Sequence, residues 1–179
     1  MKLQIEQKHS LMVRWNHWVN FPVLTLMVWS GFLIYWASPE YLLPGSWLDA
    51  IGWNYQLAKG MAWHFAFGIL FVFNGCLYVG YLLLSGQWRF PHYHGLQRLA
   101  YWGVIGMALC AVLTGFSIFK PVQLSGLTAM FGGYTPARVI HFLIAWGFIF
   151  FFVVHVIQVA RAGWNTFRAM ITGWEKKDD

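Results

Sequence analysis

Residues 138 to 161 read RVIHFLIAWGFIFFFVVHVIQVAR, an apolar run with an arginine at each end and two histidines inside it, His141 and His155. A run of about 20 apolar residues is long enough to cross a bilayer as a helix. Three other stretches are similarly apolar, and none of the four contains an acidic residue. The predicted spans cover residues 15 to 36, 61 to 84, 99 to 119 and 139 to 160.

The composition agrees with a membrane protein. Of the 179 residues, 59% are hydrophobic and only 10% are charged, which lies outside the range of soluble domains. We therefore predict an all-α membrane protein, a four-transmembrane-helix bundle that forms a single membrane-embedded domain over residues 1 to 179. The connecting segments are too short for a soluble catalytic domain and contain no Gly-rich nucleotide loop. Any chemistry must occur inside the bundle or with a partner subunit.

Lys and Arg residues predict the orientation of the chain. With four spans, both termini and the loop between the second and third spans share one side, which holds nine of the 12 Lys and Arg residues. The positive-inside rule therefore places both termini in the cytoplasm. The N-terminal MKLQIEQKHSLMVRW lacks a small-residue cleavage site, so we expect the first span to be retained. The net charge of +6 is then a topology signal and not a nucleic-acid surface.

The two cysteines, Cys76 and Cys110, both fall inside predicted spans. Neither belongs to a C-x-x-C or C-x-x-C-H motif, so they offer no iron–sulfur or zinc site and no covalent haem attachment. We expect both to be buried small apolar residues.

Four histidines lie within the spans and fall into two layers: His17, His64, His141 and His155. The last two are fourteen residues apart, which returns a helix to within about 40° of its starting direction and separates the rings by about 21 Å. The direction of each span places His64 and His141 near the outer surface, and His17 and His155 near the inner surface. A single intramembrane histidine is often a packing residue, but this joint placement favours a function.

Two imidazoles at each of two levels form the ligand set that two six-coordinate haems require. A planar haem also needs helix surface without side chains beside it. Gly31 lies fourteen residues after His17, at the outer level, and Gly75 lies eleven residues after His64, at the inner level; each is on nearly the same face as its histidine. Glycine also permits close packing between membrane helices, so both roles stay open.

Other polar side chains accompany the histidines. Three arginines lie on the surface side of them: Arg14, Arg138 and Arg161. The first two precede a histidine by three residues and share its helix face, where a guanidinium could pair with a haem propionate or extend into the headgroups. Four amides lie nearby and either orient imidazoles or bond backbone carbonyls: Asn16, Asn20, Asn74 and Gln158.

Over essentially its whole length the chain resembles the dihaem b-type cytochrome membrane subunits of bacterial nickel–iron hydrogenases, formate dehydrogenase and thiosulfate reductase. The resemblance rests on R-x-x-H-W at Arg14 to Trp18, a histidine early in the second span, and R-x-x-H followed by a histidine fourteen residues later in the fourth. It implies a multi-pass protein of the bacterial inner membrane, with two b haems: His64 and His141 bind the outer iron, and His17 and His155 bind the inner iron.

The segment YHGLQRLAYW, residues 93 to 102, is similar to a stretch of this family near its quinone pocket. The chain has His94 where the family often has Asn. A quinone carbonyl needs hydrogen-bond donors and its reduction needs protons, so His94, Gln97, Arg98 and Tyr101 are suitable side chains. The alternative is a cationic anchor in the headgroups.

The leading hypothesis is transmembrane electron transfer between a periplasmic redox partner and the quinone pool. The resemblance favours a molybdopterin oxidoreductase or a hydrogenase with an iron–sulfur relay as the partner, and the chain is then an oxidoreductase subunit without a catalytic domain of its own. Two alternatives remain open: a histidine-based proton or ion transporter, and a structural membrane anchor for a soluble enzyme. The direction of electron flow and any homo-oligomer are also open.

Overall fold

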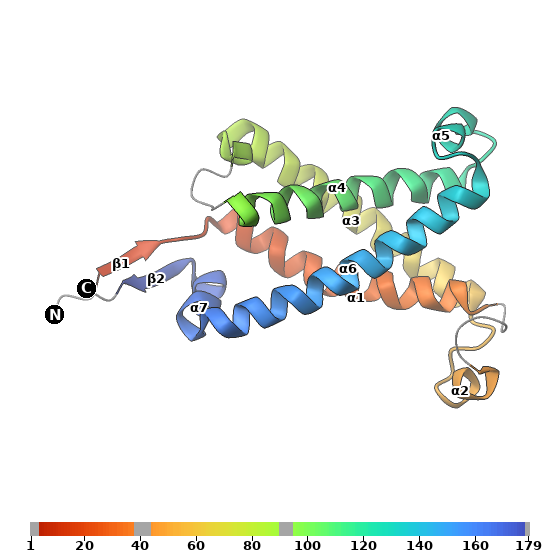
Figure 1. The fold of residues 1–179 in the computed structure, drawn as a ribbon, viewed down its shortest axis with the longest axis horizontal. Helices are drawn as coiled ribbons and strands as arrows, with labels where there is room; N and C mark the ends of the chain where they lie inside the picture. Colours follow the sequence, from red (N-terminus) through yellow and green to blue (C-terminus); the bar gives the residue numbers. More distant parts are fainter. Residues whose placement is uncertain (1–3, 38–43, 90–94, 178–179) are drawn as a thin grey trace. The chain divides into compact units, whose positions relative to one another are not determined.

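Four long helices dominate the computed structural model, which describes residues 4–37, 44–89 and 95–177 (Figure 1). They are α1 (Leu11–Tyr35), α3 (Leu57–Ser85), α4 (Gly95–Phe119) and α6 (Tyr134–Ala162). Each is long and apolar enough to cross a membrane, which confirms the predicted fold class. The helices begin four or five residues before the predicted spans, because polar turns in the headgroup region continue a helix without adding to its apolar run.

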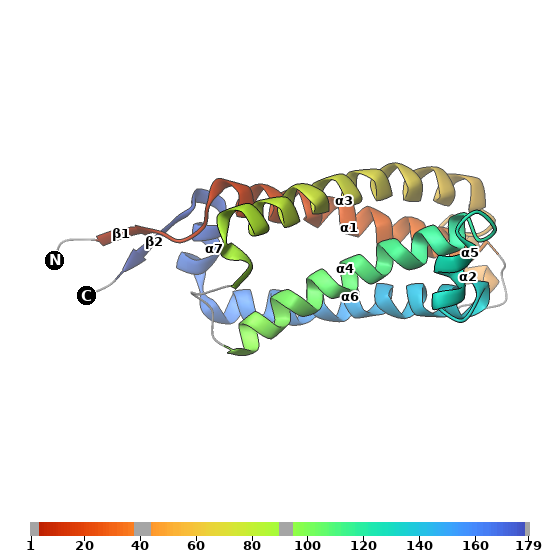
Figure 2. The ribbon, with the colours of Figure 1, turned by 90° about the horizontal axis from the view of Figure 1, so that it is seen from above.

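The chain divides into two compact units. The first, residues 1–86 and 170–177, contains α1, the short helix α2 (Gly45–Ala50), α3 and two strands, β1 (Gln4–Gln7) and β2 (Trp174–Lys177). The second, residues 87–169, contains the 3₁₀ turn η1 (Gln87–Arg89), α4, α5 (Ser125–Met130), α6 and most of α7 (Trp164–Thr172). In each unit the two long helices lie side by side and antiparallel (Figure 2).

Small and polar residues hold α1 and α3 together. At one end, a Cβ added to Gly60 would lie 3.0 Å from Cβ of Leu33 and 3.1 Å from the backbone nitrogen of Ile34. At the other end, the side-chain amide of Asn74 donates to Oδ1 of Asn20 at 3.0 Å. Membrane helices associate through such close approach and interhelical hydrogen bonds, because lipid is as apolar as the helices themselves.

The second unit is tied together in a comparable way. A Cβ added to Gly147 on α6 would lie 3.0 Å from the sulfur of Met107 on α4. The buried Ser117 hydroxyl donates to Oγ1 of Thr128 at 3.0 Å, which fixes α5 against the end of α4. Thus a short helix follows the first long helix of each unit, within the segments expected to be loops.

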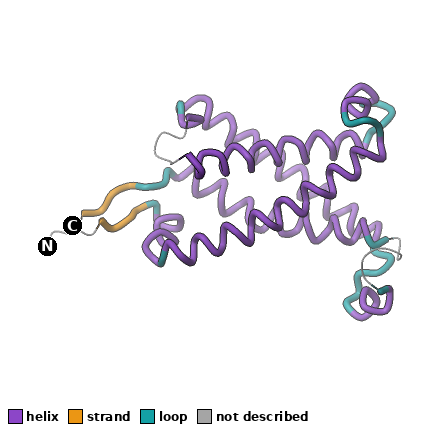
Figure 3. The backbone as a smooth tube through the Cα atoms, in the orientation of Figure 1, coloured by secondary structure: helices purple, strands orange, loops and turns teal. Residues whose placement is uncertain are grey.

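The two ends of the chain form a small structure that we call the terminal clasp, residues 4–10 and 171–177. Figure 3 shows its two strands, and β1 pairs antiparallel with β2, with Ile5 opposite Lys176. The amides of Lys8 and His9 both donate to the Gly173 carbonyl, and Lys8 forms a 2.7 Å ion pair with Glu175. The sequence alone did not predict this pairing.

The prediction that both cysteines are buried is wrong for Cys76, which is exposed on α3, whereas Cys110 is half-buried. Large apolar side chains on the same helix are also exposed, among them Ile69 and Phe73. In a membrane span lipid replaces the protein core around such side chains, so an apolar residue does not need a protein partner.

Replacing Gly60 with Ala tests the close approach of α1 and α3. The new methyl group would contact backbone and Cβ atoms that cannot move aside, so we expect the protein to lose about 1 to 3 kcal/mol of unfolding free energy. The control is Gly68→Ala, whose Cβ would meet only the flexible end of Met27 at 3.8 Å. Thermal unfolding in detergent measures both, and equal midpoints would contradict the packing described.

His9 should make the terminal clasp sensitive to pH. Burial lowers the pKa of His9 from its ordinary value, and Lys8 and Arg14 lower it further, while Glu175 opposes them. The folded clasp therefore favours the neutral ring, and its stability is complete above about pH 6.5 and is lost as the pH falls toward the lower folded pKa.

Amide hydrogen exchange measures this loss. After correction for intrinsic rates, protection at Lys8 and His9 should be lower at about pH 5.5 than at about pH 7.5. In the His9→Gln variant the difference should vanish, and an unchanged difference would show that another group titrates.

Candidate functional site

His64 on α3 is held by α1. Its Nδ1 lies 3.1 Å from the Met27 carbonyl oxygen and 3.1 Å from the Ser30 hydroxyl oxygen. The Ser30 hydroxyl is fully buried and donates to the Leu26 carbonyl at 2.6 Å. A Cβ added to Gly31 would lie 3.5 Å from Cε1 of the same ring. The imidazole edge therefore rests on a carbonyl, a hydroxyl and a glycine of the neighbouring helix.

His141 on α6 is held by α4 through the same kinds of group. Its Nδ1 lies 2.9 Å from Oγ1 of Thr114, and the Ala111 carbonyl also bonds the ring. The Thr114 hydroxyl is fully buried and donates to the Cys110 carbonyl at 2.7 Å. A Cβ added to Gly115 would lie 3.4 Å from Cε1 of His141.

These partners decide the tautomer of both rings. A carbonyl oxygen can only accept, so the ring nitrogen that bonds it must carry the hydrogen. The Ser30 and Thr114 hydroxyls each donate their single hydrogen to a carbonyl of their own helix, so the hydroxyl oxygen presents a lone pair to Nδ1 of the histidine. Nε2 then carries the lone pair, and a neutral imidazole in this form binds a metal through Nε2. Both histidines are chemically suited to ligate an iron.

The two remaining span histidines lie among aromatic rings. His17 on α1 is half-buried and meets the Trp18 ring edge-on, with centroids 5.0 Å apart. His155 on α6 is half-buried and stacks on Phe151 at 5.8 Å with 11° between the planes. The pairing of His17 with His155, and of the other two histidines with each other, stays a prediction.

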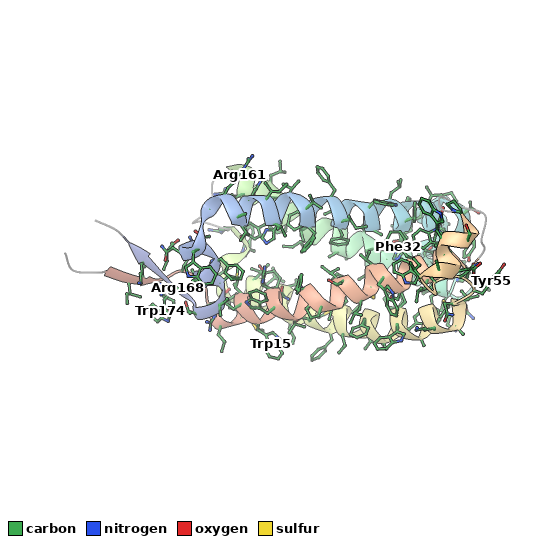
Figure 4. The ribbon with its side chains drawn as sticks, turned by 90° about the horizontal axis from the view of Figure 1, so that it is seen from below. Trp15, Phe32, Tyr55, Arg161, Arg168 and Trp174 are labelled. Carbon is green, nitrogen blue, oxygen red and sulfur yellow. The ribbon has the colours of Figure 1, made fainter. Side chains whose placement is uncertain are left out.

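Each arginine has a contact or position of its own. Arg14 donates from Nη1 to the Ile171 carbonyl at 2.8 Å, which joins α1 to the terminal clasp. The Arg138 guanidinium lies 5.6 Å above the Tyr134 ring. Arg161 is exposed and projects from the last turn of α6 (Figure 4). Pairing of these groups with propionates stays a prediction.

The three asparagines bond one another and the backbone. Asn16 donates to the Asn74 carbonyl at 3.3 Å, and Asn20 donates to Oδ1 of Asn16 at 3.1 Å. The Asn16 bond to the Asn74 carbonyl corresponds to the second of the two roles predicted for these amides, and it links α1 to α3. A Cβ added to Gly75 would meet nothing within 4 Å, so the surface there is open, and its use by a haem stays a prediction.

Three of the four quinone-site candidates lie in the first two turns of α4. Gln97 and Arg98 are exposed and Tyr101 is half-buried. His94 lies outside the described residues. The quinone site therefore stays a prediction.

Sequence reasoning missed Ser30, Thr114 and Gly115, although a signal was present. Ser-Gly-Phe at residues 30 to 32 recurs as Thr-Gly-Phe at residues 114 to 116. Within residues 4–37, 44–89 and 95–177, no three His, Cys, Asp or Glu side chains converge. A haem needs only two protein ligands, so the histidines fit a haem better than a protein-only metal site.

Apolar spans that carry histidines suited to bind a metal are typical of membrane-embedded b-type cytochromes. The chain belongs to the prokaryotic cytochrome b561 family, which matches residues 8–173. It is thus a multi-pass protein of the bacterial inner membrane that binds haem b and transfers electrons. This result confirms the predicted class of cytochrome subunit.

A curated relative agrees with this assignment. The chain is 32% identical over 202 residues to the putative protein-methionine-sulfoxide reductase subunit YedZ1 of Azospira oryzae. The alignment covers 97% of this chain and 100% of the relative. No solved structure matches the chain.

Proposed function

We propose that the chain transfers electrons across the membrane through two bis-histidine b haems, between a periplasmic redox partner and the quinone pool. His64 and His141 ligate the outer iron, and His17 and His155 ligate the inner iron. Each bound haem supplies a one-electron iron centre. The protein contributes the ligands, their orientation and an environment without water.

The observation that carries the proposal is the tautomer of His64 and His141. Nδ1 of His64 bonds the Ser30 hydroxyl and the Met27 carbonyl. Nδ1 of His141 bonds the Thr114 hydroxyl, and the Ala111 carbonyl bonds the same ring. A histidine relay for protons needs both nitrogens to exchange hydrogens, whereas a metal ligand needs one nitrogen fixed as a donor and the other as a lone pair. The hydrogen bonds at Nδ1 therefore favour a metal-ligand role for these histidines over a proton-relay role.

The position of each histidine along its helix supports the two levels. In the first unit, His17 and His64 lie near the starts of two antiparallel helices and therefore at opposite ends of the pair. In the second unit, His141 and His155 lie near the two ends of α6. Each unit thus has one span histidine near each end of its helix pair, which agrees with the two levels that we propose.

The partner follows from the relative named above. A sulfoxide reductase consumes electrons, so by analogy with YedZ1 we propose that electrons leave the membrane toward a periplasmic reductase subunit. Both termini then face the cytoplasm, as the Lys and Arg distribution predicts. A hydrogenase partner, which the sequence resemblance also allowed, would reverse the direction of flow.

At the cytoplasmic side we propose that a quinol is oxidised near the start of α4. Gln97 and Arg98 are exposed there and can donate hydrogen bonds, and Tyr101 lies one turn further along the helix. Together with His94 they offer donors to the ring oxygens and acceptors for the protons that oxidation releases.

The two alternatives make different demands. A transporter usually lines its path with carboxylates, and the four predicted spans contain none. A structural anchor would not need histidines with a fixed tautomer. Colourless purified protein that still moved ions would support the first, and recruitment of a partner without any haem would support the second.

Alanine variants of the four histidines test the ligation. The full-length protein should show two b haems in a reduced-minus-oxidised spectrum. His17→Ala and His155→Ala should each remove the same haem, and His64→Ala and His141→Ala should each remove the other, because an iron that loses one imidazole is bound far more weakly.

His9→Ala is the matched control, because His9 lies outside the spans and should leave both haems in place. Loss of different haems from His17→Ala and His155→Ala would disprove the pairing. Two haems retained in all four variants would disprove bis-histidine ligation by these residues.

A further inference from the structure

We propose that the chain is built from two copies of one helix hairpin, in which Ser30 and Thr114 are equivalent positioning residues. Together they lower the reduction potential of a single haem, the outer one. The inference rests on the proposed function for the presence of that haem. It adds two residues that touch the ligands, not the iron.

The bounds of the helices show the repetition. Helices α1 and α4 both have 25 residues, and α4 begins and ends 84 residues after α1 does. Helices α3 and α6 both have 29 residues, and α6 begins and ends 77 residues after α3 does. The short helices α2 and α5 have six residues each. The order long, short, long is therefore the same in both units.

The sequences repeat in the same register. The first helices share six residues at the displacement of 84: Arg14 and Arg98, Trp18 and Trp102, Val28 and Val112, Gly31 and Gly115, Phe32 and Phe116, and Ile34 and Ile118. The second helices share five at the displacement of 77: His64 and His141, Phe65 and Phe142, Phe71 and Phe148, Phe73 and Phe150, and Val79 and Val156. The glycines that cap their C-terminal ends, Gly86 and Gly163, correspond as well. Ser30 and Thr114 occupy one equivalent position, and each carries a hydroxyl.

The contacts repeat as well. In each copy the hydroxyl lies 2.9 to 3.1 Å from Nδ1 of the equivalent histidine. The carbonyl three residues earlier bonds the same ring, and the following glycine lies against Cε1. An arrangement present once could be incidental packing. Its presence in both units, each with its own side chains, indicates a positioning role.

A common role of Ser and Thr in membrane helices is a bond to their own backbone, and Thr25 provides the comparison. Its hydroxyl donates to the Phe21 carbonyl at 2.8 Å, as the Ser30 and Thr114 hydroxyls do four residues back. Thr25 is exposed, however, whereas the other two are fully buried against an imidazole. Thr25 is therefore a matched control for the backbone bond alone.

The expected effect follows from the hydrogen bond. An acceptor at Nδ1–H makes the imidazole a stronger donor to iron and favours the ferric state. Removing the hydroxyl weakens this effect, although the carbonyl acceptor remains. Ser30→Ala and Thr114→Val should each raise the ferrous-to-ferric ratio of the outer haem about threefold at a fixed ambient potential, where tenfold corresponds to about 59 mV.

The experiment is a redox titration of the purified full-length protein, with low-spin haem signals recorded by electron paramagnetic resonance. Ser30→Ala and Thr114→Val should shift the same one of the two haems, and the shifts should add in the double variant. Ser30→Thr and Thr114→Ser keep a hydroxyl at each position and should have the wild-type reduction potentials. Thr25→Val should leave the potentials of both haems unchanged.

Two outcomes would overturn the inference: both variants matching Thr25→Val, or the two variants shifting different haems. Ser30→Ala removes only one oxygen atom. If Thr114→Val does not fold, the result for Ser30→Ala therefore decides the test. Wild-type protein without two b haems would instead disprove the proposed function.

Discussion

An imidazole inside a bilayer has no water to bond its N–H group, and each helix pair is arranged around this requirement. An unsatisfied polar group in hydrocarbon costs several kcal/mol. On α3 and α6 a carbonyl and a hydroxyl of the neighbouring helix bond the imidazole and so offset this cost. Because Nδ1 takes part in these bonds, the contact that makes the histidine tolerable in lipid also leaves the lone pair on Nε2, the atom that would bind a metal. The same contact would thus serve both stability and the ligation that we propose.

That contact requires the helices of a pair to lie close together. Gly60 permits the approach beside Leu33 in the first unit, and Gly147 permits it beside Met107 in the second. Burial of apolar surface against apolar surface gains little in lipid, so small residues and hydrogen bonds must supply the association. Gly60 lies four residues before His64, and Gly147 lies six residues after His141. Each glycine therefore contributes to the orientation of a nearby histidine, because it fixes the distance to the hydroxyl that bonds the ring.

The spans and the position of each histidine along its helix could be predicted from the sequence, because both depend on local composition and on spacing along one helix. The terminal clasp could not, since β1 and β2 are four residues each, without apolar alternation, and pair across almost the whole chain. The role of Ser30 could not be read from one helix either. Thr25 makes the same backbone bond, and only the ring on α3 distinguishes the two hydroxyls. Comparing the two halves of the chain would have supplied the missing signal.

The two copies agree at one end and differ at the other. At one end His64 and His141 are equivalent and have partners of the same kinds, whereas at the other end His17 corresponds to Tyr101 and His155 corresponds to Tyr78. A phenol keeps the ring and a polar tip but offers no neutral nitrogen lone pair to iron. Each copy thus has one imidazole at this other end, on its first helix in one case and on its second in the other. Under the ligation that we propose, the four equivalent ring positions at this end therefore supply one bis-histidine pair, in agreement with the two haems of the proposed function.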